Sequence, residues 1–275
     1  MTDLSGRIAV VTGAGRGLGQ RAAIRLARRG ASLVLIARSE AQLRATASTI
    51  ADNGGKAFVI PMDLAAQRTH EAVARSVIDA AGGRPSILVN AAGMFGPIAL
   101  VQNTDPEAWI ETLMVNAVSH YLTCRAFVGG MLEQGWGRIV NVTSAAALHE
   151  PGPINSAYGT SKAALNQFTR HLAAELAGTG VTANVIHPGD VKTEMWADIR
   201  ASVSRLGPEA ASYQKWASWV EETGGDDPEK AADLIEDLMS EAAGEVNGQF
   251  LWIEGGLQPP SANWSSGAKD MPWKR

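Results

Sequence analysis

The stretch VTGAGRGLGQ, residues 11–20, joins an apolar run to a helical pattern through a turn rich in glycine. Gly13, Gly17 and Gly19 lie between Val11 and a segment in which apolar residues recur every four positions. Such a turn lets the backbone approach a pyrophosphate, whose charge is stabilised by the free amides and the dipole of the helix N-terminus. The spacing is not G-x-G-x-x-G, and a glycine-rich turn can be only a tight turn. The strand-to-helix context nevertheless favours a dinucleotide site.

The rest of the chain alternates short β-branched runs with longer segments rich in alanine and leucine. This alternation predicts an α/β fold, a Rossmann-type doubly wound parallel sheet of about seven strands with helices on both faces. Glycines after the helices and two Asp-Pro pairs, at 105–106 and 227–228, mark the joints and two helix starts. Strands are expected at Ile8–Val11, Leu33–Ile36, Ala57–Ile60, Ile87–Val89, Ile139–Val142, Thr182–Ile186 and Phe250–Ile253.

No internal repeat, linker or low-complexity segment divides the chain. We therefore expect one domain over residues 1–256, with a mobile insertion near 190–225 that lacks the strand pattern. An irregular tail is expected over residues 257–275.

The composition excludes several classes of protein. Of the 275 residues, 45% are hydrophobic and 19% charged, and the formal net charge is −4, so no basic surface for nucleic acid or acidic lipid is expected. No signal peptide, membrane span or metal-binding motif is recognisable, and we expect a cytoplasmic protein. Cys124 is the single cysteine, and its apolar surroundings predict a buried thiol.

Three polar turns follow predicted strands. Asn90 and Gly93 end the fourth strand, Ser144 follows the fifth, and Pro188 and Gly189 follow the sixth. Because ligands of open parallel sheets bind at the carboxyl ends of the strands, these turns should face the same crevice as the glycine-rich turn.

The stretch SAYGTSKAAL, residues 156–165, places a phenol and an amine four positions apart on a predicted helix. Tyr158 and Lys162 should therefore share one helix face. A nearby ammonium would favour the phenolate and lower the pKa of Tyr158. The alternative is an ordinary surface tyrosine beside a surface lysine.

The order of these motifs from Arg7 to Gly256 resembles the short-chain dehydrogenase/reductase family in its compact form. The resemblance implies an oxidoreductase in which Tyr158 is the general acid or base and Ser144 hydrogen-bonds the substrate oxygen. Lys162 would lower the pKa of Tyr158 and bind the nicotinamide ribose, and Asn116 would hold a water that links Lys162 to solvent. The alternative is that both residues are only structural. Ser144 would then cap a helix or turn, and Asn116 would be a buried amide whose hydrogen bonds are all made within the core.

The resemblance also implies a set of residues that contact a nicotinamide nucleotide. The turn at residues 90–93 reads Asn-Ala-Ala-Gly where the family has Asn-Asn-Ala-Gly. The expected cofactor contacts are Thr12, Gly13, Arg16, Gly17, Leu18, Gly19, Arg38, Asp63, Leu64, Asn90, Ala91, Gly93, Tyr158, Lys162, Pro188, Gly189, Val191 and Thr193.

The end of the second predicted strand indicates which nucleotide is bound. Ala37 stands where NAD enzymes carry an acidic side chain, and Arg38 follows it. Arg38 and Arg16 could both pair with a 2′-phosphate, so NADP(H) is favoured over NAD(H). The alternative is two exposed arginines on surface turns.

The resemblance makes residues 190–225 a flap that covers the substrate. Its bulky apolar side chains, with Phe95, His149 and Trp196 as candidate contacts, suggest a hydrophobic or 3-oxoacyl-type carbonyl substrate. The same aromatic side chains could instead pack on the body or on a neighbouring subunit. The family also implies a homo-oligomer, a dimer or tetramer built through helices at about 105–133 and 158–177. The alternative functions are a lapsed nucleotide-binding sensor or scaffold, or a dehydratase or epimerase on the same fold.

Overall fold

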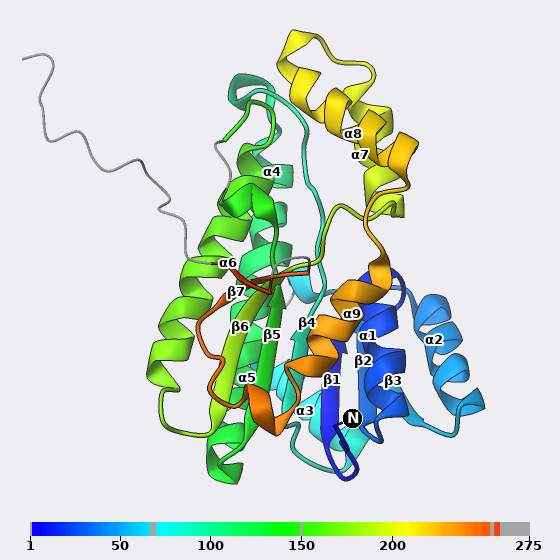
Figure 1. Ribbon diagram of the computed structural model, residues 1–275, viewed down its shortest axis with the longest axis vertical. Helices are drawn as coiled ribbons and strands as arrows, with labels where there is room; N and C mark the ends of the chain where they lie inside the picture. Colours follow the sequence, from blue (N-terminus) through cyan, green and yellow to red (C-terminus); the bar gives the residue numbers. More distant parts are fainter. Residues whose placement is uncertain (1, 67–69, 149–150, 254–255, 259–275) are drawn as a thin grey trace, which may run out of the picture.

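The computed structural model describes residues 2–66, 70–148, 151–253 and 256–258. Its centre is one sheet with the order β3-β2-β1-β4-β5-β6-β7-β8, in which β1 to β7 are parallel (Figure 1). The chain reverses its direction of travel across the sheet between β1 and β4, which is the arrangement of a doubly wound fold. The strands are β1 (Ile8–Thr12), β2 (Ser32–Ala37), β3 (Lys56–Pro61), β4 (Ile87–Asn90), β5 (Gly137–Val142), β6 (Val181–His187), β7 (Phe250–Trp252) and β8 (Gly256–Gln258).

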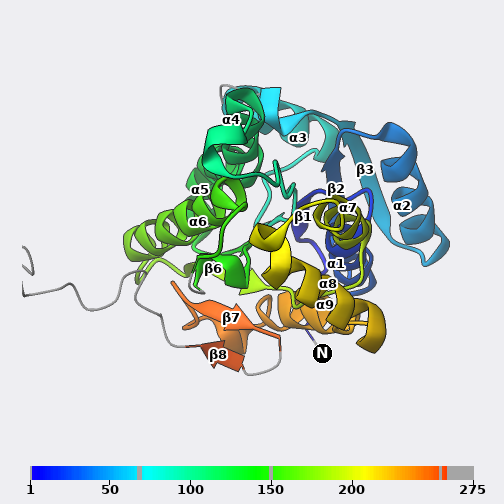
Figure 2. The same ribbon diagram turned by 90° about the horizontal axis from the view of Figure 1, so that it is seen from above.

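Helices cover both faces of this sheet, as the alternating sequence pattern predicted. One face carries α1, α2 and α9, and the other carries α3, α5 and α6 (Figures 1 and 2). Figure 1 shows α7 and α8 beyond the carboxyl ends of the strands. The helices are α1 (Gly17–Arg28), α2 (Glu40–Asp52), α3 (His70–Ala81), α4 (Pro106–Leu113), α5 (Ser119–Gln134), α6 (Ser156–Glu175), α7 (Glu194–Val203), α8 (Ala211–Thr223) and α9 (Pro228–Asp237).

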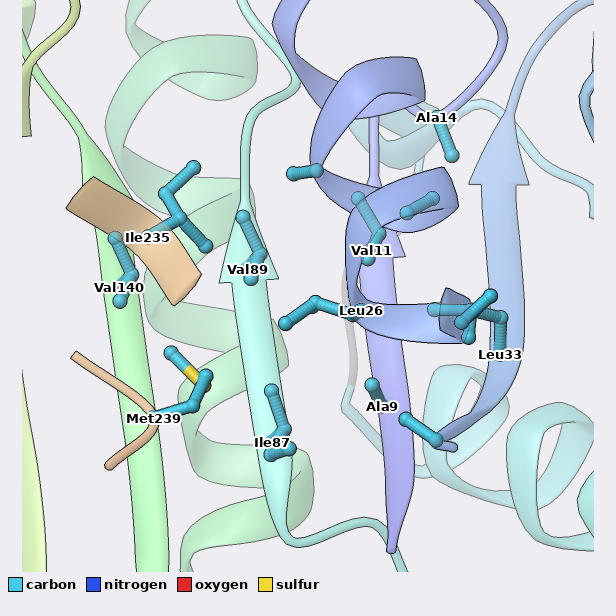
Figure 3. Packing of buried hydrophobic residues seen from close by; sticks show 14 of the residues in the cluster. Ala9, Val11, Ala14, Leu26, Leu33, Ile87, Val89, Val140, Ile235 and Met239 are labelled. Carbon is cyan, nitrogen blue, oxygen red and sulfur yellow. The ribbon is translucent and has the colours of Figure 1, made fainter. Parts of the chain in front are cut away.

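Successive strand residues point to opposite faces and build two apolar layers. On β1, Ala9 and Val11 belong to one apolar cluster, in which Leu26 of α1 lies near them and Ile235 of α9 lies beside Val89 and Val140 (Figure 3). Val10 points to the other face, toward α3 and α5. Because both faces are covered, the strands are apolar at nearly every position, which is why they could be predicted from the sequence.

Local signals place the helix ends as expected. Asp105 and Asp227 cap α4 and α9 and are each followed by proline at the first helical position. Gly30, Gly54 and Gly82 follow α1, α2 and α3 with positive φ angles of 94°, 77° and 69°. Of the described helices, none is long and apolar enough to span a bilayer.

The structure corrects the predicted start of the irregular tail and shows which elements the insertion contains. Residues 256–258 form β8, which pairs antiparallel with β7 and adds an eighth strand, so the start of the predicted tail is ordered. Residues 190–225 are mainly helical, with α7 and α8 packed on each other. The remainder of the tail, with Trp264 and Trp273, lies outside the described residues. The division into domain and tail stays a prediction.

The helix expected at 105–133 contains a change of winding. Between α4 and α5 the residues Met114–Val118 form a π-helix, in which hydrogen bonds span five residues. Asn116, at its centre, is fully buried. Wide turns of this kind occur preferentially at functional sites.

A row of ion pairs fastens α9 to α1. Arg21 and Arg25 both pair with Glu229, and Arg25 also pairs with Asp233. Arg29 completes the row through a 2.6 Å contact with Glu236. The side chain of Arg25 is only 24% exposed, and its hydrogen bond lowers the pKa of Glu229.

We expect Arg25→Gln to destabilise the fold by about 1–2 kcal/mol, because one substitution removes the centre of a charge network. Urea unfolding with a matched Arg44→Gln variant measures this loss. Among the described residues Arg44 pairs only with Glu40, on its own exposed helix face, so its variant should lose about 0.5 kcal/mol of stability or less. Equal losses in the two variants would contradict the role given to the row.

Candidate active site

A large chamber opens at the carboxyl ends of the parallel strands. Its volume is about 1090 Å³, and it runs from the glycine-rich turn to the helices α7 and α8. The turns after β1, β4, β5 and β6 all contribute to its wall, as the topology predicts. The predicted residues that line it are Gly13, Arg16, Gly17, Leu18, Gly19, Arg38, Asp63, Leu64, Ala91, Gly93, Phe95, Ser144, Tyr158, Lys162, Pro188, Gly189, Val191, Thr193 and Trp196.

Close backbone packing shapes the glycine-rich turn. A Cβ on Gly13 would lie 2.8 Å from the carbonyl oxygen of Ala91, and one on Gly19 would overlap the carbonyl of Gly13. Gly17 has a φ of 58°, and a Cβ there would enter open space. Close packing therefore requires glycine at positions 13 and 19, and a left-handed backbone requires it at positions 13 and 17.

Thr12 and Asn90 support the site without lining it. The Thr12 hydroxyl accepts hydrogen bonds of 3.1 Å from the amides of Ala91 and Ala92, which ties β1 to the turn after β4. Asn90 is fully buried and donates to Asn141 Oδ1 at 2.9 Å. Both were predicted as cofactor contacts, and in the structure both are interior residues.

Three hydrogen bonds fix α6 against β5. Lys162 Nζ donates to the carbonyl of Val142 at 2.9 Å, and Thr143 Oγ1 donates to Asn166 Oδ1 at 2.5 Å. Deeper in the core, Asn141 Nδ2 donates to Thr169 Oγ1 at 2.8 Å. Because Lys162, Asn166 and Thr169 lie on successive turns of one helix face, they set the position of α6 along the strand.

Tyr158, Ser144 and Lys162 meet in the chamber wall. The Ser144 hydroxyl is close enough to the Tyr158 phenol to lower its pKa. Lys162 Nζ lies 5.6 Å from the centre of the Tyr158 ring. The two side chains therefore share one helix face at the crevice, which agrees with their spacing of four.

The protonation of this pair differs from the sequence-based expectation. Burial raises the pKa of Tyr158, the hydrogen bond with Ser144 lowers it, and the charge of Asp190 raises it. Burial also lowers the pKa of Lys162 to about 7. The expected lowering of the Tyr158 pKa by Lys162 is thus wrong here, because burial penalises both charged forms.

Asn116 is held by three hydrogen bonds. Its Oδ1 accepts from the Met94 amide at 2.9 Å, and its Nδ2 donates to the Met94 carbonyl at 2.8 Å and to Ser161 Oγ at 3.0 Å. A Cβ on Gly93 would lie 3.5 Å from Asn116 Oδ1 and 3.7 Å from Lys162 Nζ. The side chain thus clamps the turn after β4 onto α6, beside Lys162.

The two arginines predicted for a 2′-phosphate have different surroundings. Arg16 forms an ion pair with Glu194 at the start of α7. Arg38 is exposed beside Ala37 at the end of β2, and none of the ion pairs among the described residues involves it. Asp63 accepts from the Ala65 amide at 3.0 Å and also lines the chamber.

The other end of the chamber is aromatic. Phe95 stacks on Tyr158 with ring centres 4.7 Å apart, and Tyr213 of α8 meets Phe95 edge-on at 5.8 Å. Trp216 stands next to Tyr213, and the buried Trp196 of α7 also lines the wall. His149, the remaining predicted substrate contact, lies outside the described residues.

Several lining residues escaped the prediction from sequence. Trp252 ends β7, and the strand-end rule used for the other strands would have found it. Asn155 and Ser212 carry no recognisable signal, because their place depends on how α8 packs over α6.

The chamber suits a nicotinamide nucleotide. The N-terminus of α1 opens into it with no side-chain cap at Arg16 and no acidic residue in the first turn, so its amides can bind a pyrophosphate. Lys162 and Tyr158 line the same space. Within the described part of the chain, no three His, Cys, Asp or Glu side chains are grouped as metal ligands.

Comparisons with known proteins agree with this geometry. The family model for short chain dehydrogenase matches residues 7–204. Short-chain reductase protein NovJ of Streptomyces niveus is 38% identical over 252 residues, covering 90% of this chain and 93% of NovJ. The 3-oxoacyl-acyl-carrier-protein reductase FabG of Aquifex aeolicus is 30% identical over 256 residues, covering 92% and 98% of the two chains.

Solved structures give the same result. A variant of actinorhodin polyketide ketoreductase crystallised with NADPH matches with a TM-score of 0.80 and 30% identity, over 92% of this chain and 97% of that chain. The glycine-rich turn, the strand-end turns and the Tyr158–Lys162 pair occupy one chamber on this fold. The chain therefore belongs to the short-chain dehydrogenase family of oxidoreductases.

Proposed function

We propose that this protein is an NADP(H)-dependent oxidoreductase that interconverts a carbonyl and a secondary alcohol. The observation that carries the proposal is the meeting of Ser144, Tyr158 and Lys162 in the wall of one chamber that also reaches the N-terminus of α1. A protein that only binds a nucleotide has no use for a phenol held between a hydroxyl and a buried amine.

In this proposal Ser144 and Tyr158 bind and protonate the oxygen of the substrate, and Lys162 supports Tyr158. When bound, the nicotinamide ring supplies or removes the hydride at the carbonyl carbon. Ser144 donates a hydrogen bond that holds the oxygen, and Tyr158 gives it a proton during reduction or takes one during oxidation. The raised pKa keeps Tyr158 protonated, so the described side chains are set for its action as an acid.

Lys162 then restores the proton of Tyr158. Its pKa of about 7 means that its amine exchanges a proton readily near neutral pH. Asn116 is the positioning residue behind it, because it holds Ser161 and the turn around Gly93. A water at Asn116, linking Lys162 to solvent, is part of the proposal.

The preference for NADP(H) rests mainly on Arg38. It lines the chamber next to Ala37, where no carboxylate would repel a 2′-phosphate. Arg16 supports the preference less directly, since it is already paired with Glu194.

The aromatic end of the chamber favours a hydrophobic or 3-oxoacyl-type carbonyl as substrate. Phe95, Tyr213 and Trp216 offer an apolar wall directly beside Tyr158. Relatives that reduce 3-oxoacyl groups by name, such as FabG, support this choice.

We also propose a cytoplasmic homo-oligomer, a dimer or tetramer. Ile110 and Tyr121 are large apolar side chains, 51% and 43% exposed, on the long α4–α5 rod. Phe168 of α6 contacts Tyr121 edge-on, so the apolar surface continues onto α6. A second copy of the chain would cover it.

We expect Tyr158→Phe to lower kcat by at least about a hundredfold, because the proton donor is removed. The measurement is oxidation of NADPH with a panel of ketones and the reverse reaction with alcohols. Nucleotide binding should stay nearly unchanged, and Tyr121→Phe, a tyrosine outside the chamber, should keep full activity. Persisting turnover in Tyr158→Phe would refute the proposed role, and product formed without change in the nicotinamide would indicate a dehydratase or epimerase.

We expect Arg38→Asp to weaken NADP binding by about 10- to 100-fold and NAD binding far less, because a charge-assisted contact to phosphate is replaced by repulsion. Titration calorimetry with both nucleotides measures the effect. Arg28→Asp, an exposed arginine of α1 outside the chamber, is the matched control. Equal affinity of the unmutated protein for the two nucleotides would contradict the preference.

We expect the stability difference between the wild type and Lys162→Met to depend on pH. Between pH 7 and the ordinary lysine pKa of 10.5, the unfolded chain holds a proton that the folded chain has released. The free energy of unfolding of the wild type should therefore rise relative to that of the variant by up to a few kcal/mol as pH rises through this window. Urea unfolding at pH 7 and pH 10 tests this, with the exposed Lys192→Met as control; a constant difference would show that Lys162 keeps its proton.

A further inference from the structure

We infer that Tyr213 and Asn155 form a second oxygen-binding position in the substrate chamber, which selects carbonyl compounds carrying a hydrogen-bond-accepting oxygen near the reacting carbonyl. The class is that of 3-oxo esters and thioesters. The inference rests on the proposed function of Tyr158 and adds a specificity-determining residue to it.

Tyr213 stands beside Tyr158, although it comes from α8 of the insertion. The rings of Tyr158 and Tyr213 both contact Phe95, with centres 4.7 Å and 5.8 Å from it. Both side chains line the same chamber. The two phenols therefore belong to one aromatic group in the chamber wall, near enough for the charge of an ionised Tyr158 to raise the pKa of Tyr213.

The hydroxyl of Tyr213 is arranged as a donor. It accepts a hydrogen bond from Asn155 Nδ2, and no hydrogen bond that it donates is found within the described residues. Burial raises the pKa of Tyr213 to about 12, so the group keeps its proton. A neutral phenol of this kind can donate a hydrogen bond to a carbonyl oxygen.

Asn155 does not cap the helix that it precedes. It is the N-cap residue of α6, where asparagine normally accepts a bond from the helix backbone, yet its side chain makes no such bond. Its amide bonds Tyr213 instead, and its Oδ1 is buried with no partner among the described residues. The N-terminus of α6 therefore lacks a side-chain cap, and the Asn155 side chain orients Tyr213 instead.

The backbone before Asn155 is strained in support of this arrangement. Ile154 has a φ of 64°, in the left-handed region that β-branched residues avoid. Its buried side chain packs in the cluster that includes Phe95, Tyr213 and Trp216. Strain of this kind persists where the surrounding structure holds it, and it is concentrated at functional sites.

The chemistry of the substrate follows from the two phenols. Ser144 and Tyr158 hold the oxygen that is reduced, and the Tyr213 hydroxyl donates to an oxygen a few bonds away. A 3-oxo ester has its second carbonyl two carbons from the first, which suits two donors that line one chamber on either side of a shared contact with Phe95. A simple ketone leaves the Tyr213 donor without a partner and loses that contact.

The test compares ethyl 3-oxobutanoate with heptan-2-one, which has the same chain length and lacks the ester oxygens. In Tyr213→Phe we expect kcat/KM for the ester to fall by about tenfold or more, mainly through KM, and that for heptan-2-one to change by less than about twofold. The intrinsic reactivity of the two probes cancels, because each variant is compared with the wild type on the same compound.

Asn155→Leu and Tyr121→Phe complete the experiment. Asn155→Leu should lower the ester preference in the same direction, and Tyr121→Phe should leave it unchanged. An unchanged ester preference in Tyr213→Phe, or an equal loss for both probes, overturns the inference while Tyr158→Phe still reports on the proposed function. A wild type that oxidises NADPH with neither these probes nor any carbonyl of the panel overturns the proposed function itself.

Discussion

The hydrogen bonds between α6 and β5 are the constraint on which the rest of the site depends. Lys162, Asn166 and Thr169 bond Val142, Thr143 and Asn141 on one strand. An apolar helix face alone could slide along a sheet, since dispersion contacts have little directional preference. Polar pairs buried in the interface cannot slide without leaving groups unpaired, so they fix the depth of Tyr158 relative to Ser144 at the end of β5.

The same buried network makes the charged form of Lys162 unfavourable. Lys162 is 3% exposed, and its Nζ donates to a neutral carbonyl; among the residues that the structure describes, no carboxylate pairs with it. Its charged form is therefore disfavoured, and the neighbouring phenol is held protonated for the same reason. Asn116 rigidifies this region by closing three hydrogen bonds around Met94 and Ser161. The arrangement exchanges stability for groups whose protons are easily moved.

Much of this could be predicted from the sequence, for physical reasons. The strands are apolar on both faces, so the fold follows from the hydrophobic pattern. The carboxyl ends of parallel strands meet at one edge of the sheet, so the crevice shared by Gly13, Ser144 and Tyr158 follows from the positions of the strand ends. The pKa directions could not be predicted, because they depend on burial that only packing determines. The pairing of Arg16 with Glu194 and of Asn155 with Tyr213 joins segments whose contact is set by how α7 and α8 fold over the chamber.

The π-helix at Met114–Val118 has a consequence for how this chain can change. An extra residue in one turn rotates everything after it by about 100° relative to a regular helix. Asn116 faces Ser161 and Met94 while Thr123, one to two turns later, still reaches Asn90. Deleting a single residue from this turn would bring the backbone to regular α-winding yet misalign either the clamp or the core polar network. The number of residues between Asn116 and Thr123 is thus fixed by the hydrogen bonds that each of them must make. Insertions or deletions are tolerable only outside this interval.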